Sequence, residues 1–126
     1  MSQKLLIVDD EAHIRMLIEQ TLEELEEHDV EFFSAENGEQ ALEIIRNENP
    51  QLVFLDVMMP KMNGMEVCRR VRSELSLNDT YIILLTAKGQ EADKQKGQEV
   101  GADLYLTKPF DPEMLLRKAK KVLGIH

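Results

Sequence analysis

The chain has 126 residues, a formal net charge of −9 and a single cysteine. Its length suits one domain with a sizeable core, its negative charge argues against a nucleic-acid-binding surface, and one cysteine excludes a disulfide within the chain. No apolar run is long enough for a membrane span or a signal peptide, so we expect a protein of the reducing cytoplasm.

Short apolar runs, typical of strands that are buried on both faces of a parallel sheet, recur along the chain. They predict strands at residues 5–8, 30–33, 52–55, 81–85 and 103–106. Helical patterns separate these runs at the intervals of βα units. The sequence therefore predicts one α/β domain over residues 1–126, with a doubly wound, five-stranded parallel sheet and five helices.

The predicted helices differ in how much apolar surface they can bury. The inner face of the first helix is expected to be Ile14, Leu17, Ile18, Thr21, Leu22 and Leu25, and that of the second Ala41, Leu42 and Ile45, with its end at Asn49-Pro50. The third helix is expected to start near Gly64. The fourth should run from about Glu91 to Val100, and the fifth from about Pro112 to Leu123, with Gly124 as the stop. The fourth has almost no apolar stripe, so we expect it to be the least stable and a candidate for a moving part.

Polar side chains lie just past the ends of four of the predicted strands. Asp9 and Asp10 follow the first strand, Asp56 the third, Thr86 the fourth, and Lys108 stands two residues after the fifth. A carboxylate at the end of so apolar a run is costly unless it binds something. Ligands of open α/β sheets bind at the carboxyl ends of the strands, so these residue types predict a binding pocket there.

The order of these residues resembles that of response-regulator receiver domains, the phospho-accepting modules of two-component signalling. In length the chain resembles the single-domain chemotaxis regulators. The residues that carry the resemblance are Asp9-Asp10, Asp56, Met59-Pro60, Asn63-Gly64, Thr86-Ala87, Tyr105 and Lys108-Pro109-Phe110. It covers essentially the whole chain. It implies the flavodoxin-like strand order 2-1-3-4-5, which places the pocket residues on neighbouring strands, and a cis Lys108–Pro109 peptide bond.

The resemblance also implies the chemistry of the pocket. Asp56 would take a phosphoryl group from the phosphohistidine of a sensor histidine kinase or of a phosphotransfer protein. The reaction brings anions together, so Mg²⁺ (or Mn²⁺) would be needed. Asp10 would bind the metal directly, Asp9 through water, and Asp56 and the backbone carbonyl of Met58 would complete the protein ligands. Three carboxylates this close should raise the pKa of at least one of them.

Two further residues would stabilise the phosphoryl group, and a third would change position in response to it. Lys108 would contact the phosphoryl oxygens and the Thr86 hydroxyl would donate to them. Thr86 would move inward, Tyr105 would fill the vacated space, and the surface of the fourth helix, fifth strand and fifth helix would change. That surface carries Lys94, Lys96, Glu99, Asp103, Lys118 and Lys120, whose mixed charges could pair across a two-fold homodimer or on a downstream protein or effector domain. The protein would be a signalling switch and not an enzyme.

Three other interpretations compete with this one. Asp9, Asp10 and Glu11 could serve only as a cap of the first helix, but that explains neither Asp56 nor the lysine. A phosphatase of the haloacid dehalogenase type would need a second aspartate two residues after Asp56, where this chain has Met58. A pseudo-receiver that is never phosphorylated would usually lose one of the pocket residues, which are all present.

The lifetime of the phosphorylated form depends on the residues that can orient an attacking water. Those positions hold Met58 and Lys88, and neither side chain can act as a hydrogen-bond acceptor or base for that water. The sequence therefore predicts slow dephosphorylation. It leaves open whether the chain is a standalone regulator or the receiver of a longer protein.

Overall fold

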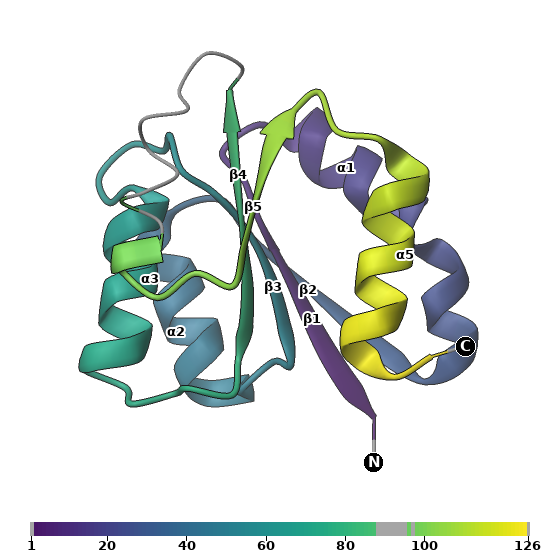
Figure 1. The fold of residues 1–126 in the computed structure, drawn as a ribbon, viewed down its shortest axis with the longest axis horizontal. Helices are drawn as coiled ribbons and strands as arrows, with labels where there is room; N and C mark the ends of the chain where they lie inside the picture. The colour runs from purple at the N-terminus through teal and green to yellow at the C-terminus, as the bar shows by residue number, and fades with distance from the viewer. Residues whose placement is uncertain (1, 88–95, 97, 126) are drawn as a thin grey trace.

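The computed structural model describes residues 2–87, 96 and 98–125, and its centre is a parallel sheet of five strands (Figure 1). The strands are β1 (Gln3–Val8), β2 (Val30–Ala35), β3 (Leu52–Asp56), β4 (Tyr81–Ala87) and β5 (Leu104–Lys108). Their order is β2-β1-β3-β4-β5 and each neighbouring pair is parallel. The predicted fold class and strand order are confirmed.

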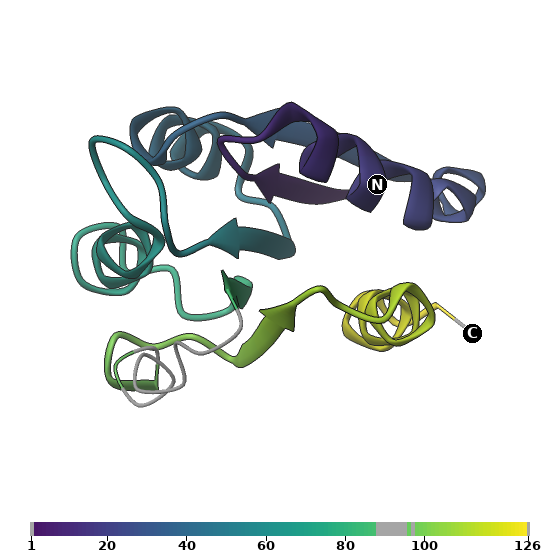
Figure 2. The same cartoon turned by 90° about the horizontal axis from the view of Figure 1, so that it is seen from above.

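Helices cover both faces of the sheet, as Figures 1 and 2 show from two directions. In the described part of the chain they are α1 (Ala12–Thr21), the 3₁₀ helix η1 (Glu23–His28), α2 (Gly38–Glu48), α3 (Gly64–Ser73) and α5 (Pro112–Leu123). α1, η1 and α5 form one layer with the sheet, and α2 and α3 form the other. The predicted α2, α3 and α5 are therefore confirmed.

The first helix was expected to continue through Leu25, and this is wrong. The α-helix ends at Thr21 and a 3₁₀ helix follows. With three residues per turn, this helix keeps Leu22 and Leu25 on the same side, and both are fully buried. Leu17 was also expected on the inner face, but its side chain is 45% exposed and lies beside Pro109 and Phe110.

The core consists of two apolar clusters, one on each face of the sheet. In β3, Leu52 and Phe54 pack into the cluster with α1 and α5, whereas Val53 and Leu55 pack into the cluster with α2 and α3. All four side chains are fully buried, which explains why the strand reads as an uninterrupted apolar run rather than as an alternating pattern. Figure 2 shows β3 near the middle of the sheet.

The helix predicted from about Glu91 to Val100 falls mostly outside the described residues, although residues 96, 98 and 99 are helical. The prediction that this helix is the least stable also lies mostly outside the described residues. Across the parts of the chain that the structure describes, every helix is too short or too polar to traverse a lipid bilayer.

An arginine of α3 ties that helix to the loop before β4 and to the segment before β5. The Arg72 guanidinium donates to the carbonyl oxygens of Leu77 at 2.5 Å and Gly101 at 3.0 Å, and it pairs with the Asp103 carboxylate at 2.9 Å. The same carboxylate oxygen accepts from the backbone N–H of Ile82. We refer to Arg72 and Asp103 with these contacts as the Arg72 clip. It fixes the residue that directly precedes β5.

Candidate functional site

Three charged side chains meet at the carboxyl end of the sheet. Asp56 is the last residue of β3, Asp9 directly follows β1, and Lys108 is the last residue of β5. The Lys108 ammonium lies 2.8 Å from Asp9 Oδ2 and 3.2 Å from Asp56 Oδ1. Both carboxylates are buried, with Asp9 fully so and Asp56 4% exposed. We refer to these three residues as the Asp56 pocket.

The lysine reaches this pocket across a neighbouring strand, because β4 separates β5 from β3. A long, flexible side chain suits such a reach, and its ammonium bridges two anions that would otherwise repel each other. Burial alone would lower the pKa of Lys108, but its bonds to Asp9 and Asp56 and their charges outweigh burial and raise it. The ammonium is therefore charged at neutral pH.

The pKa of Asp56 rises from its ordinary value of 3.8 to about 6. Burial is the largest cause, followed by the charge of Asp9. Lys108 and a hydrogen bond from the Met58 backbone N–H act in the opposite direction. The expectation that one pocket carboxylate has a raised pKa is confirmed, but desolvation contributes more than the repulsion between carboxylates on which the expectation rested.

This raised pKa predicts how Asp56 affects stability. The folded protein binds the Asp56 proton more tightly than the unfolded chain does, so its stability falls as the pH rises from about 4 to 6. Above pH 6 the buried charge costs roughly 3 kcal/mol, at about 1.4 kcal/mol per pKa unit. We expect Asp56→Asn, measured by urea unfolding without metal at pH 7.5, to be more stable than the parent by up to about that amount.

The gain should shrink as the pH approaches 4, where the parent carboxyl becomes neutral as well. Asp79→Asn, at an exposed carboxylate, is the matched control and should change stability little at either pH. A parent that is more stable than Asp56→Asn at pH 7.5, or a difference that does not change with pH, would contradict the prediction.

The acids after β1 form a cluster beside the pocket. One carboxylate oxygen from each of Asp9, Asp10 and Glu11 lies within 4.8 Å of the others, and Asp10 and Glu11 are exposed. Hard oxygen donors of this kind fit Mg²⁺. Capping explains the cluster poorly, because the N-cap residue of α1 is Glu11 and its side chain makes no capping hydrogen bond.

The turn after Asp56 requires the residues that the sequence has there. A Cβ atom at Gly64 would collide with the Asp56 carbonyl oxygen, and the Gly64 N–H donates to the Val57 carbonyl at 2.9 Å. Asn63 caps α3 by accepting from the N–H of Glu66 at 3.0 Å. The Asn63-Gly64 pair thus brings the start of α3 against the end of β3.

The remaining predicted site residues lie in different surroundings. Thr86 is buried near the end of β4, in register with Thr107 of β5. Tyr105, in the middle of β5, is half-buried and packs against the cluster of α2 and α3. Met58 is 58% exposed. Lys88 lies outside the described residues. The predicted cis Lys108–Pro109 bond is confirmed.

Sequence reasoning missed one residue of the site. The Arg15 guanidinium donates to the backbone carbonyl of Asp9 at 2.6 Å, and it lies 4.0 Å from the Glu36 carboxylate. Its side chain is only 17% exposed. The one signal in the sequence is its position, a helical turn after the acids that begin α1, and arginines at such positions are usually solvated.

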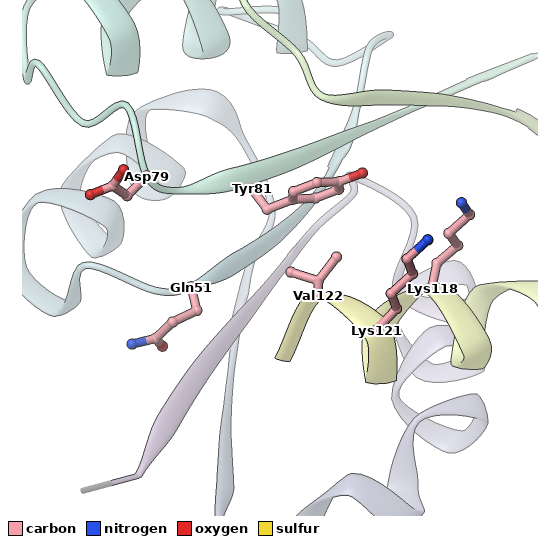
Figure 3. A pocket seen from close by; sticks show the side chains of 6 residues that line it. All are labelled: Gln51, Asp79, Tyr81, Lys118, Lys121 and Val122. Carbon is pink, nitrogen blue, oxygen red and sulfur yellow. The ribbon is translucent and has the colours of Figure 1, made fainter. Parts of the chain in front are cut away.

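Among the pockets of the described residues, two bear on the Asp56 pocket by their position. One of about 270 Å³ adjoins it and is mainly apolar, lined by Ile14, Leu17, Ala87, Lys108, Pro109 and Phe110. The other, of about 390 Å³, is lined by Gln51, Asp79, Tyr81, Lys118, Lys121 and Val122 (Figure 3). Gln51 and Asp79 precede β3 and β4, so this second pocket lies at the opposite end of the strands from Asp56.

Comparison with known proteins gives one consistent result. The family described as the response regulator receiver domain matches residues 5–120. The chain is 47% identical over 121 residues to the "Probable transcriptional regulator ycf27" of Porphyra purpurea, covering 96% of this chain and 47% of that protein. It is 43% identical over 123 residues to the alkaline phosphatase synthesis transcriptional regulatory protein PhoP of Bacillus subtilis, covering 98% of this chain and 49% of that protein.

A solved structure matches over nearly its whole length. It is the chemotaxis response regulator CheY4 of Vibrio cholerae, with a TM-score of 0.83, 34% identity, and coverage of 97% of this chain and 99% of that chain. In contrast, the chain spans about half the length of the curated relatives it matches.

Proposed function

Because the chain belongs to the response regulator receiver domain family of two-component systems, we propose that it is a phosphorylation switch whose acceptor is Asp56. One observation supports this most strongly: a buried carboxylate at the end of β3 shares a lysine ammonium with a second buried carboxylate. A pair of buried acids is costly to maintain for structure alone. It is well suited to receiving a phosphoryl group.

In the proposed reaction an oxygen of the Asp56 carboxylate attacks the phosphorus of a phosphohistidine. A P–O bond forms, the P–N bond breaks, and the donor imidazole leaves with the bonding electron pair. Lys108, already 3.2 Å from Asp56, contacts the phosphoryl oxygens and compensates their charge. The Thr86 hydroxyl, which lies on the neighbouring strand, donates to a phosphoryl oxygen.

The residues proposed to hold Mg²⁺ (or Mn²⁺) are Asp10 directly, Asp9 through water, Asp56 and the backbone carbonyl of Met58. The ion would neutralise the charge that accumulates between the carboxylate and the phosphoryl group. Support comes from the oxygen donors of the acid cluster and from the adjoining Asp56 pocket. The full burial of Asp9 agrees with a role behind a water rather than at the exposed side of the ion.

The proposed response starts at Thr86 and Tyr105. Thr86 moves toward the phosphoryl group, and the Tyr105 ring enters the space that it leaves. Tyr105 is half-buried and packs against the cluster of α2 and α3, so an inward position would cost little solvation. The switching surface comprises the fourth helix region, β5 and α5.

The proposed partners are a sensor histidine kinase or phosphotransfer protein in the cytoplasm, and a downstream protein or effector domain. The exposed Leu17 and the adjoining apolar pocket lie beside Lys108 and offer contact area to the donor. A homodimer through the switching surface remains a proposal. Asp103 and Lys120, two of the charges expected to pair across it, already pair within the chain with Arg72 and Glu24.

Incubation with acetyl phosphate, with and without Mg²⁺, tests the function. We expect stable labelling of one residue per chain, only with Mg²⁺. Continuous turnover of the donor would indicate a phosphatase, and an absence of labelling would indicate a pseudo-receiver.

We also predict that the phosphorylated form decays slowly. Met58 is exposed beside the acceptor, and its thioether accepts hydrogen bonds only weakly, so an attacking water gains no orientation from it. Replacement by Asn should accelerate phosphate loss several-fold, and Lys88→Glu should do the same by adding an acceptor. The measurement is a decay time course after donor removal. Met16→Asn, at a similarly exposed methionine of α1, is the control and should leave the rate unchanged. Parent decay within seconds, or no acceleration in either variant, would refute this prediction.

A further inference from the structure

Every polar group of Asp9 already has a partner within the chain. Its N–H donates to the Ala35 carbonyl at 3.2 Å, and its carbonyl accepts from Arg15 at 2.6 Å. One carboxylate oxygen accepts from the Glu11 N–H at 2.9 Å, and the other pairs with Lys108. Asp9 is thereby fixed by four residues, which belong to β2, to α1 and its N-cap, and to β5.

Among these partners of Asp9, Arg15 is the one that binds the Asp9 carbonyl, which leads into the next residue. The Asp9 carbonyl and the Asp10 N–H belong to the same planar peptide unit. A guanidinium that holds the carbonyl therefore also sets the direction in which the chain continues through Asp10. The short contact and the burial of the Arg15 side chain indicate a fixed position, and a second guanidinium nitrogen lies 4.0 Å from the Glu36 carboxylate.

We propose that Arg15 is a positioning residue for the metal site: it holds the Asp9–Asp10 peptide so that the Asp10 carboxylate stays beside that of Asp9, within the 4.8 Å seen in the acid cluster. This rests on the proposed function. The positive charge of Arg15, next to the acid cluster, would by itself weaken the binding of Mg²⁺ through charge repulsion. If Arg15 acts by positioning Asp10, its removal should weaken Mg²⁺ binding; if only its charge matters, its removal should strengthen it. The affinity for Mg²⁺ therefore distinguishes the two roles.

The experiment measures the dissociation constant of Mg²⁺ by titration calorimetry in the parent, Arg15→Met and Arg15→Lys. Arg15→Met should bind Mg²⁺ roughly tenfold more weakly, the lower end of the effect of losing a residue that orients a ligand. Arg15→Lys retains a donor and should recover part of the loss. Labelling by acetyl phosphate should be slow at low Mg²⁺ and approach the parent rate at saturating Mg²⁺.

The Arg72→Met variant is the matched control. Arg72 is similarly buried, with a 15% exposed side chain, and it too donates to backbone carbonyls. It lies in α3, however, and pairs with Asp103 rather than with a residue of the acid cluster or of the Asp56 pocket. It should lower stability without weakening Mg²⁺ binding. Unchanged or tighter Mg²⁺ binding in Arg15→Met, or equal weakening in Arg72→Met, would overturn the proposal and leave the proposed function intact. If the parent neither binds Mg²⁺ nor becomes labelled, both fail.

Discussion

Asp56→Asn is expected to abolish phosphoryl labelling, reducing it by more than about 100-fold under conditions in which the parent is fully labelled. The amide has nearly the shape of the carboxylate but cannot act as the nucleophile, so the fold should remain intact. Asp56 lies at the end of a fully buried strand and next to Lys108, and the loss of its charge should relieve repulsion with Asp9 rather than disturb packing.

The measurement is intact-protein mass spectrometry after incubation with acetyl phosphate and Mg²⁺, followed by mapping of the labelled residue. Asp79→Asn, at an exposed carboxylate near the other end of the sheet, should be labelled like the parent. Labelling that persists in Asp56→Asn at another residue would remove Asp56 from its proposed role.

The second large effect is expected from Asp10→Asn. Asp10 is the exposed aspartate of the acid cluster, and replacing a charged oxygen ligand by a neutral one should weaken Mg²⁺ binding by at least about tenfold, since even the loss of an outer-shell partner costs that much. Mg²⁺ binding should also weaken below about pH 6, because Asp56, whose pKa is about 6, must lose its proton to act as a ligand.

Titration of the parent, Asp10→Asn and Glu11→Gln at pH 7.5 and pH 5 measures both effects. Glu11 has a similar exposure and belongs to the same cluster, so Glu11→Gln controls for the general loss of negative charge and should have a much smaller effect. Equal effects of the two substitutions would show that Mg²⁺ responds to the charge of the cluster and not to Asp10 as a ligand.

The parts of the molecule that were predictable from sequence are those determined by local patterns. α5 has the predicted bounds, because Asp111 caps its start by accepting from the Glu113 N–H and Gly124 ends it with a left-handed backbone. The convergence of Asp9, Asp56 and Lys108 was predictable as well, because parallel strands bring their carboxyl ends to one edge of the sheet.

The parts that were missed depend on contacts that leave no pattern in the sequence. Arg15 and Arg72 each bind backbone carbonyls, and since every residue has a carbonyl, no residue type marks the partner. The end of α1 was also missed, because the spacing of Leu22 and Leu25 suits an α-helix and a 3₁₀ helix alike. The cause of the raised Asp56 pKa was misjudged because the depth of burial depends on the packed tertiary structure.

The Arg72 clip has a consequence for how β5 can move. The strand is tethered at both ends: Asp103, just before it, is held by Arg72 and Ile82, and Lys108, its last residue, is held by Asp9 and Asp56. Tyr105 stands between these tethers, so sliding of the whole strand would break ion pairs at both ends, whereas a change of the Tyr105 rotamer would break neither. If the switch consists of a rotamer change of Tyr105, the backbone hydrogen bonds between β4 and β5 stay intact. The chain could then return to its resting form without separating any strand from its neighbour.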